Sequence, residues 1–118
     1  MALRPYPRSR RVSELLLEEI SWLIRRELKD PRIGFVTLTQ VSMSKDLSHA
    51  KVFVSIMGEE EERTKSIEGL KNSAGFIRMK LKENLRLRII PEITFVLDTT
   101  LEKVQRINEL IRDIQEEP

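Results

Sequence analysis

Hydrophobic residues between positions 12 and 28 recur at steps of three and four, the spacing of one face of an α-helix. The members of this stripe are Val12, Leu15, Leu16, Ile20, Leu23, Ile24 and Leu28. We expect the helix to stop near Asp30, because Pro31 disfavours helical dihedrals at the residue before it. Trp22 lies beside the stripe and is expected in the core rather than as a stacking platform.

Positions 34–44, GFVTLTQVSMS, are rich in β-branched residues and predict a strand. The apolar alternation that begins at Val36 changes parity by Val41, and this phase slip indicates a bulge near Gln40. After a short turn at 45–48, clean alternation predicts a second strand whose apolar members are Ala50, Val52, Val54 and Ile56. Two strands joined by so short a turn predict an antiparallel hairpin.

Beyond Gly58 the pattern returns to helix, then strand, then helix. Four acids at 59–62 precede the next helical stretch, where they complement the dipole; we favour this interpretation over an acidic binding site. The apolar stripe of that stretch is Ile67, Leu70, Ala74, Ile77, Leu81 and Leu85. A third strand follows Pro91, and Thr99 with Glu102 has the spacing of a capping box before a last helix. The apolar face of this last helix comprises Leu101, Val104, Ile107, Ile111 and Ile114.

Gly75 lies inside the long helical stretch, where glycine costs about 0.5–1 kcal/mol relative to alanine. At about 100° per residue and with Ile67 at zero, the apolar stripe centres near 320° and Phe76 falls near 180°. A break at residues 73–75 would reset this phase and turn Phe76 inward, and helix kinks do occur at Gly/Ser pairs. We therefore predict a kink.

Cations flank the apolar stripe on the same helical wheel, between about 20° and 100°: Lys71, Arg78, Lys82 and Arg86. Gly75 falls among them, near 80°. A helix N-terminus suits a phosphate when a glycine leaves its backbone open and cations lie beside it. The pattern therefore favours a groove that binds the backbone of a nucleic acid. The alternative stays open that Gly75 only permits close packing of two helices and that the cations only keep the protein soluble.

The kink is thus predicted within a single α+β domain of 118 residues, a small sheet covered on one face by helices. We place the domain at 9–115, after a flexible basic arm at 1–8 and before a tail at 116–118. Positions 1–11 carry +4 and positions 71–90 carry +5, while the formal net charge is +2, so the remainder carries −7. Such segregation can orient a protein on a polyanion.

The amino-acid composition argues against several kinds of functional site. The chain has no cysteine, and no apolar run approaches the roughly 20 residues of a membrane span. Metal-assisted phosphodiester cleavage needs converging carboxylates, and the one histidine, His49, precedes a strand where a turn or packing role is expected. We expect a cytoplasmic monomer without membrane contact, metal, cofactor or enzymatic activity.

Three stretches resemble the bacterial ribosome-binding factor A family in order and spacing, over roughly residues 6–115: KDPRIGFVTLTQVSMSKDLSHAKVFVS, LKNSAGFIRMKL and NLRLRIIPEITFVLDTT. The resemblance implies a KH-like fold of type II, α-β-β-α-kink-α-β, with a C-terminal helix. It also implies a non-enzymatic cytoplasmic factor that binds free 30S ribosomal subunits. Such factors assist late maturation, including 5′-end processing of 16S rRNA, and matter for growth in the cold.

Nucleotide-binding KH domains carry a Gly-x-x-Gly loop between their central helices, whereas this family has an Ala-x-Gly kink. The matching residues here are Ser73, Ala74 and Gly75, so serine replaces the alanine of the Ala-x-Gly kink, and Asn72 stands where the first glycine of a Gly-x-x-Gly loop would fall. We interpret this pattern as a kink that shapes a groove.

The predicted RNA-binding residues form three groups: the N-terminal cations, the kink and the cations around it, and a weaker candidate in the hairpin turn. They are Arg8, Arg10, Arg11, Lys45, Lys71, Ser73, Ala74, Gly75, Arg78, Lys82, Arg86 and Arg88. The predicted partners are the 30S subunit and its 16S rRNA, with ribosomal proteins or other assembly factors as further candidates. Two alternatives are a nuclease that trims rRNA and a protein-interaction module that uses the acidic side of the last helix without touching RNA.

Overall fold

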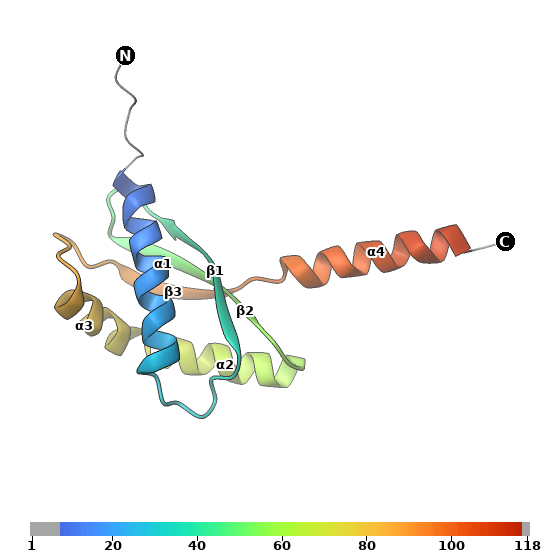
Figure 1. Cartoon of the computed structure of the whole chain (residues 1–118), viewed down its shortest axis with the longest axis horizontal. Coiled ribbons are helices and arrows are strands. Elements are labelled where there is room, and N and C mark those ends of the chain that lie inside the picture. The colour runs from blue at the N-terminus through green and yellow to red at the C-terminus, as the bar shows by residue number, and fades with distance from the viewer. Residues whose placement is uncertain (1–7, 117–118) are drawn as a thin grey trace, which may run out of the picture.

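The computed structural model describes residues 8–116 (Figure 1). Its elements are α1 (Arg8–Arg26), β1 (Val36–Met43), β2 (His49–Ile56), α2 (Glu60–Asn72), α3 (Ala74–Asn84), β3 (Glu92–Leu97) and α4 (Thr100–Glu116). This is the predicted order of elements. The predicted arm lies outside the described residues except for Arg8, which begins α1, and so do positions 117 and 118 of the predicted tail.

The three strands form one sheet in the order β1-β2-β3. The β1 and β2 strands pair antiparallel, as predicted for a hairpin, and the register shifts between Leu38 and Gln40, which confirms the bulge. The β2 and β3 strands pair parallel, beginning with His49 opposite Glu92. The imidazole of His49 lies 3.3 Å from the Glu92 carboxylate, so this side chain has a partner within the sheet.

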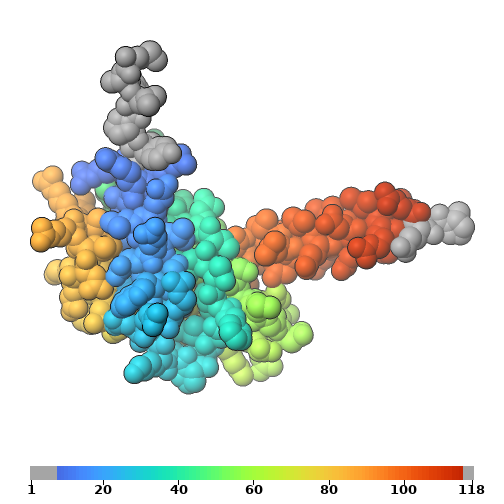
Figure 2. Space-filling view, in the orientation of Figure 1, coloured from blue at the N-terminus to red at the C-terminus, as the bar shows by residue number. Residues whose placement is uncertain are grey.

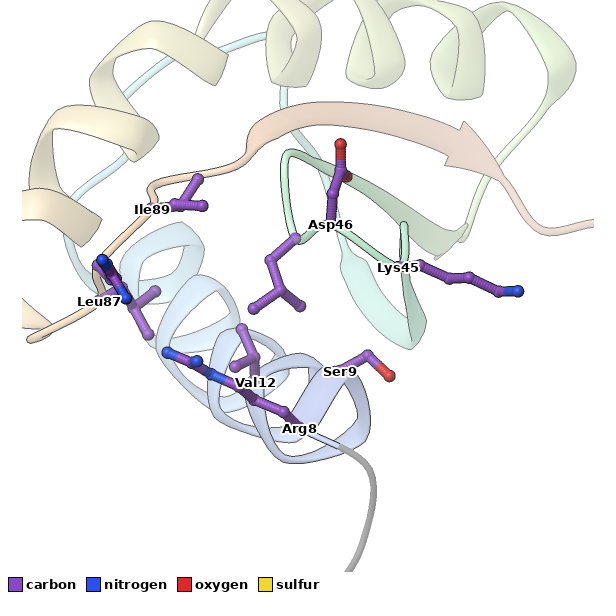
Figure 3. A pocket seen from close by; sticks show the side chains of 9 residues that line it. Arg8, Ser9, Val12, Lys45, Asp46, Leu87 and Ile89 are labelled. Atoms are coloured by element: carbon purple, nitrogen blue, oxygen red, sulfur yellow. The ribbon is translucent and has the colours of Figure 1, made fainter.

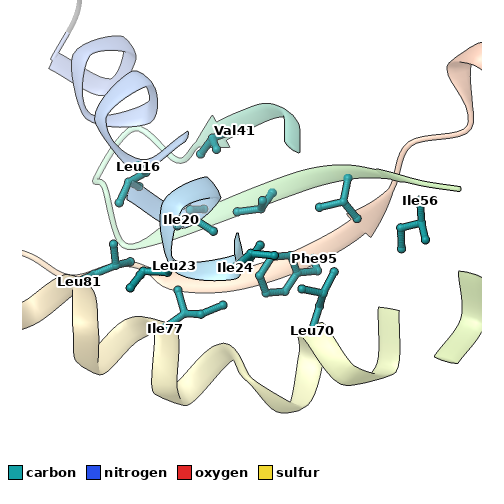
Figure 4. Packing of buried hydrophobic residues seen from close by; sticks show 13 residues of the cluster. Leu16, Ile20, Leu23, Ile24, Val41, Ile56, Leu70, Ile77, Leu81 and Phe95 are labelled. Carbon is teal, nitrogen blue, oxygen red and sulfur yellow. The ribbon is translucent and has the colours of Figure 1, made fainter. Parts of the chain in front are cut away.

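The α1, α2 and α3 helices cover one face of the sheet and close a single hydrophobic core over it (Figure 4). Alternate residues of β2 point into this core, as their pattern predicted. The buried members are Leu16, Ile20, Leu23, Ile24, Val41, Ala50, Val52, Val54, Ile56, Leu70, Ile77, Leu81 and Phe95. Burial of these side chains fixes the directions of α2 and α3, and hence the surface at their junction.

The segment between α1 and β1 is anchored on α2. The buried Ser66 hydroxyl accepts a hydrogen bond from the Gly34 amide (3.0 Å) and donates one to the Arg32 carbonyl (3.1 Å). At Gly69, a β-carbon would lie 2.8 Å from Cγ1 of Ile33, so only glycine allows this close approach. These contacts hold α2 firmly beside the sheet.

Trp22 is not part of the core, contrary to expectation. Its side chain is 43% exposed and lines a shallow depression with Glu18, Glu19 and Asn84. Side chains two residues apart on a helix point in directions that differ by about 200°, so Trp22 faces away from the buried Ile20.

The predicted capping box at the start of α4 is also wrong. Instead, Asp98, two residues before α4, accepts hydrogen bonds at its carboxylate from the Thr100 amide (3.0 Å) and hydroxyl. These bonds from Thr100 lower the pKa of Asp98. Glu102 reaches α2 instead and forms an ion pair with Arg63 at 3.0 Å.

The α4 helix projects from the rest of the molecule and takes no part in the layer over the sheet (Figures 1 and 2). Its apolar side chains are between 47% and 72% exposed: Leu101, Val104, Ile107, Leu110, Ile111 and Ile114. The amphipathic pattern thus predicted the helix correctly but not the exposure of its apolar face. No helix among residues 8–116 is long and apolar enough to cross a membrane.

Candidate nucleic-acid interface

The junction of α2 and α3 is a break at a single residue, Ser73, as the sequence predicted. The Ser73 hydroxyl donates a hydrogen bond to the Gly69 carbonyl at 2.8 Å, and its amide reaches the carbonyls of Gly69 (3.1 Å) and Leu70 (3.0 Å). Such back-bonding of a serine to the preceding turn is typical where helices bend. The hydroxyl of Ser73 therefore serves the backbone at the break.

Gly75 lies in the first turn of α3 and is exposed. A β-carbon built at Gly75 would meet no other atom within 4 Å. Close packing of two helices therefore does not explain this glycine. The interpretation that remains is a groove that admits a nucleic-acid backbone. Amides in the first turn of a helix lack acceptors within that helix, so Gly75 opens part of an anion-attracting N-terminus to solvent.

Phe76 does not turn into the core, so this prediction is wrong. The ring is half-buried outside the core cluster, and the Lys80 ammonium lies 5.7 Å from its centroid. Lys80 is also held between Glu27 (3.5 Å), which directly follows α1, and Glu83 (3.7 Å). Ser73 has φ −89° and ψ −3°, a turn-like conformation outside the usual scatter of an α-helix, and this break does not bring Phe76 onto the buried face.

Gly75 opens onto a groove of about 710 Å³, which we call the joint groove. Arg78 crosses from α3 and donates a hydrogen bond to the Ile90 carbonyl at 3.1 Å, which holds the segment before β3 against the helix. Three predicted cations converge here. The groove is lined by Gly75, Arg78, Met79, Lys82, Arg88, Ile89 and Ile90.

A second hollow of about 610 Å³ adjoins the joint groove at Arg88 and Ile89, and we call it the end pocket. Three segments far apart in the sequence meet around it: the start of α1, the turn between β1 and β2, and the segment between α3 and β3 (Figure 3). It is lined by Arg8, Ser9, Val12, Lys45, Asp46, Leu47, Leu87, Arg88 and Ile89. The fold thus brings Arg8 and Lys45 to the same end of the molecule as Arg88.

Among residues 8–116, Asp46 supplies the one carboxylate in the lining of the end pocket. It accepts hydrogen bonds from the hydroxyls of Ser48 and Ser44, both at 2.7 Å, and from the Ser48 amide at 3.1 Å. These hydrogen bonds lower the pKa of Asp46 to about 2, and the bond from the Ser48 hydroxyl contributes most. The carboxylate therefore stays ionised at neutral pH and fixes the shape of the hairpin turn.

Other predicted residues lie outside the two hollows. Arg10 lines a separate depression beside β1 and forms an ion pair with Glu14 at 3.5 Å. Arg11, Lys71 and Arg86 are exposed, but they line neither hollow. The side chain of Ala74 packs against the core, so only its backbone faces the joint.

Apolar lining residues were missed by the sequence analysis. Met79 is 49% exposed in the joint groove, and Ile89 is 48% exposed between the two hollows. The sequence pattern could have placed Met79 near the groove, because this residue falls near 120° on the helical wheel, next to the basic stripe. No sequence pattern could have placed Ile89, because it lies in an irregular segment without helical or strand periodicity.

These features define a small α+β domain with a basic groove beside an open glycine in the first turn of α3. The model of the ribosome-binding factor A family matches residues 8–111. Ribosome-binding factor A of Halothermothrix orenii is 51% identical over 110 residues, which cover 93% of this chain and 90% of that relative. The chain belongs to the ribosome-binding factor A family.

Solved structures share the fold. The solution structure of a Thermotoga maritima protein, proposed to be a ribosome binding factor A, matches with a TM-score of 0.69 and 35% identity; the match covers 80% of this chain and 91% of that one. A Thermus thermophilus ribosome binding factor A, fitted as a homology model into a cryo-EM map of a 30S complex, matches with a TM-score of 0.56 and 27% identity. That match covers 77% of this chain and 91% of the neighbour.

Proposed function

We propose that this protein is a non-enzymatic factor that binds free 30S subunits in the cytoplasm and assists their late maturation, including 5′-end processing of 16S rRNA. In this proposal the domain is a KH-like module of type II whose α2–α3 junction faces rRNA. The observation that carries the proposal is the open Gly75 beside Arg78, Lys82 and Arg88. The fit of the Thermus thermophilus relative into a 30S complex supports the choice of partner.

The chemistry of the joint groove suits a sugar-phosphate chain. Arg78, Lys82 and Arg88 would neutralise phosphates, and the absent side chain of Gly75 would let a backbone approach the first turn of α3. Phosphate contacts carry no sequence information, so the shape of the rRNA would select the site. Binding of this kind positions a particle for maturation without breaking a bond.

Co-sedimentation with purified free small subunits tests the proposal. We expect the protein to co-migrate with them at moderate salt. The logarithm of the binding constant should fall linearly with the logarithm of the salt concentration, because each neutralised phosphate releases counterions. A protein that stays unbound at moderate salt would contradict the proposal.

Cleavage of rRNA by this protein itself is the enzymatic alternative. Metal-assisted hydrolysis uses carboxylates that converge on a cation. The cluster of acids, Glu60 to Glu62, instead forms the first turn of α2, and the described residues that line the joint groove include no carboxylate. Incubation of precursor rRNA with the protein and Mg²⁺ should leave the RNA intact, and specific cleavage would restore the alternative.

The α4 helix favours a second candidate, contact with a ribosomal protein or another assembly factor. Its exposed apolar stripe, Leu101 to Ile114, has no partner in the described chain. Pull-down from extract with and without RNase separates the two functions: a partner retained after RNase binds protein, and one that is lost binds through RNA.

A further inference from the structure

We infer that the end pocket takes one unpaired base of single-stranded RNA, whose flanking phosphates lie on the cations at its rim. This inference rests on the proposed RNA binding and extends it from the backbone to a base. Small-ligand pockets have volumes of about 300–1,000 Å³ and mostly apolar linings with few polar groups. The end pocket, at about 610 Å³, has this size, and its apolar lining residues are Val12, Leu47, Leu87 and Ile89.

The backbone of Leu47 provides an independent reason to assign a ligand to this pocket. Leu47 has a φ of 62°, the left-handed region that glycine favours and that costs other residues about 1–2 kcal/mol. The turn holds it there, because its amide donates to the Ser44 carbonyl at 3.0 Å and Asp46 braces the neighbouring serines. Leu47 lines the pocket and lies outside the core cluster, so the core does not explain this strain. Backbone strain of this kind clusters at functional sites.

The charges around the pocket favour a nucleotide over an apolar protein side chain. Arg8, Lys45 and Arg88 come from three different segments, and Asp46, the one carboxylate among the described lining residues, already accepts three hydrogen bonds. An apolar interior with a cationic rim matches a base with its phosphates. Proteins that bind single-stranded RNA splay bases out of the stack, and apolar side chains can sandwich such a base. The pocket also continues the joint groove through Arg88 and Ile89, along the proposed path of the RNA.

The test compares two 5′-labelled oligonucleotides of equal length and charge by fluorescence anisotropy. One is a single-stranded RNA decamer with all four bases, and the other is its abasic ribose-phosphate counterpart. The wild-type protein should bind the base-bearing decamer roughly tenfold more tightly, the factor that about 1.4 kcal/mol of apolar contact gives. Equal binding of the two decamers, or binding of neither, would overturn the base pocket.

Two variants locate the effect. Leu47→Gly suits the left-handed backbone, so the turn should persist, and the preference for bases should vanish while binding of the abasic decamer and its salt dependence stay the same. Arg88→Ala should weaken binding of both decamers alike and flatten the salt dependence. Retention of the base preference in Leu47→Gly would exclude this pocket as its source.

Co-sedimentation with free 30S subunits separates failure of this inference from failure of the proposed function. Wild-type protein that co-migrates with subunits but does not distinguish the decamers keeps the proposed function and loses the base pocket. If Leu47→Gly then also failed to co-migrate, an apolar group of a ribosomal protein would be the occupant, which contradicts the inference. Loss of both activities in the wild type would remove the proposed function as well.

Discussion

A single glycine carries most of the functional argument at the residue scale. The sequence places Gly75 among cations, but it does not distinguish an open groove from close packing of two helices. That distinction depends on distances set by the tertiary structure. The structure separates them: Gly69 is the glycine required for close packing, and Gly75 faces open space. Two glycines six positions apart in one helical stretch thus have different roles, and no local pattern distinguishes them.

Substitution of Gly75 by alanine should make the protein more stable and its binding weaker. The free energy of unfolding should rise by about 0.5–1 kcal/mol, because alanine is the better helix former and its β-carbon meets nothing. Binding to free 30S subunits should weaken roughly tenfold if RNA approaches this backbone. Chemical denaturation and co-sedimentation measure the two effects.

Gly69→Ala is the matched control, since it makes the same chemical change one turn before the break. Its β-carbon would lie 2.8 Å from Ile33, so stability should fall by about 1–3 kcal/mol. An unchanged affinity in Gly75→Ala would show that the open backbone does not meet RNA.

Asp46 makes stability depend on pH in the acid range. Its pKa is about 2 in the folded protein against an ordinary 3.8, so its contribution is complete above about pH 4 and is lost as the pH falls toward 2. Asp46→Ala should therefore melt below the wild type at pH 7. The difference between their melting temperatures should shrink between pH 4 and pH 2. A difference that stays constant over this range would contradict the assignment.

At the scale of elements, periodicity predicted most of the fold. The hairpin, its bulge and the break at Ser73 are confirmed, because each depends on residues close together in the sequence. Phe76, Trp22 and the capping box were wrong for a different reason. Tertiary packing decides which side of α3 is buried after the break, only one face of α1 packs on the core, and Glu102 pairs with Arg63, which is distant in the sequence.

Removal of α4 after Thr100 should leave the rest of the domain folded. The apolar residues of α4 are exposed, so the deletion removes little buried surface, and the denaturant m-value should stay nearly the same. Urea denaturation measures both the midpoint and the slope. Glu102→Gln in the full chain is the control, because it breaks the ion pair with Arg63 without removing the helix. A marked loss of stability beyond this control would show that α4 supports the core.

At the scale of the whole molecule, the surface arises from segments that the sequence keeps apart. Arg8, Lys45 and Arg88 meet around the end pocket, although more than thirty positions separate each from the next. All three are predictable from the sequence by their charge, but the sequence does not reveal that they share a pocket or that Arg10 lines a separate depression. The apolar lining of the pocket was missed because it exists only once the chain is folded.

The proposed function depends on the cations of the joint groove, which would hold the 30S subunit. The direct test is co-sedimentation of free subunits with the double variant Arg78→Glu, Lys82→Glu at moderate salt. Lys103→Glu with Arg106→Glu on α4 is the control, since it makes the same change in net charge on exposed helical positions. Arg78→Glu removes the hydrogen bond to the Ile90 carbonyl, so the groove variant should melt slightly below the wild type and the α4 variant close to it, with both folded at the temperature of the assay. We predict that the groove variant stays unbound and the α4 variant co-migrates. Equal binding by both variants, or loss in the α4 variant alone, would contradict the account.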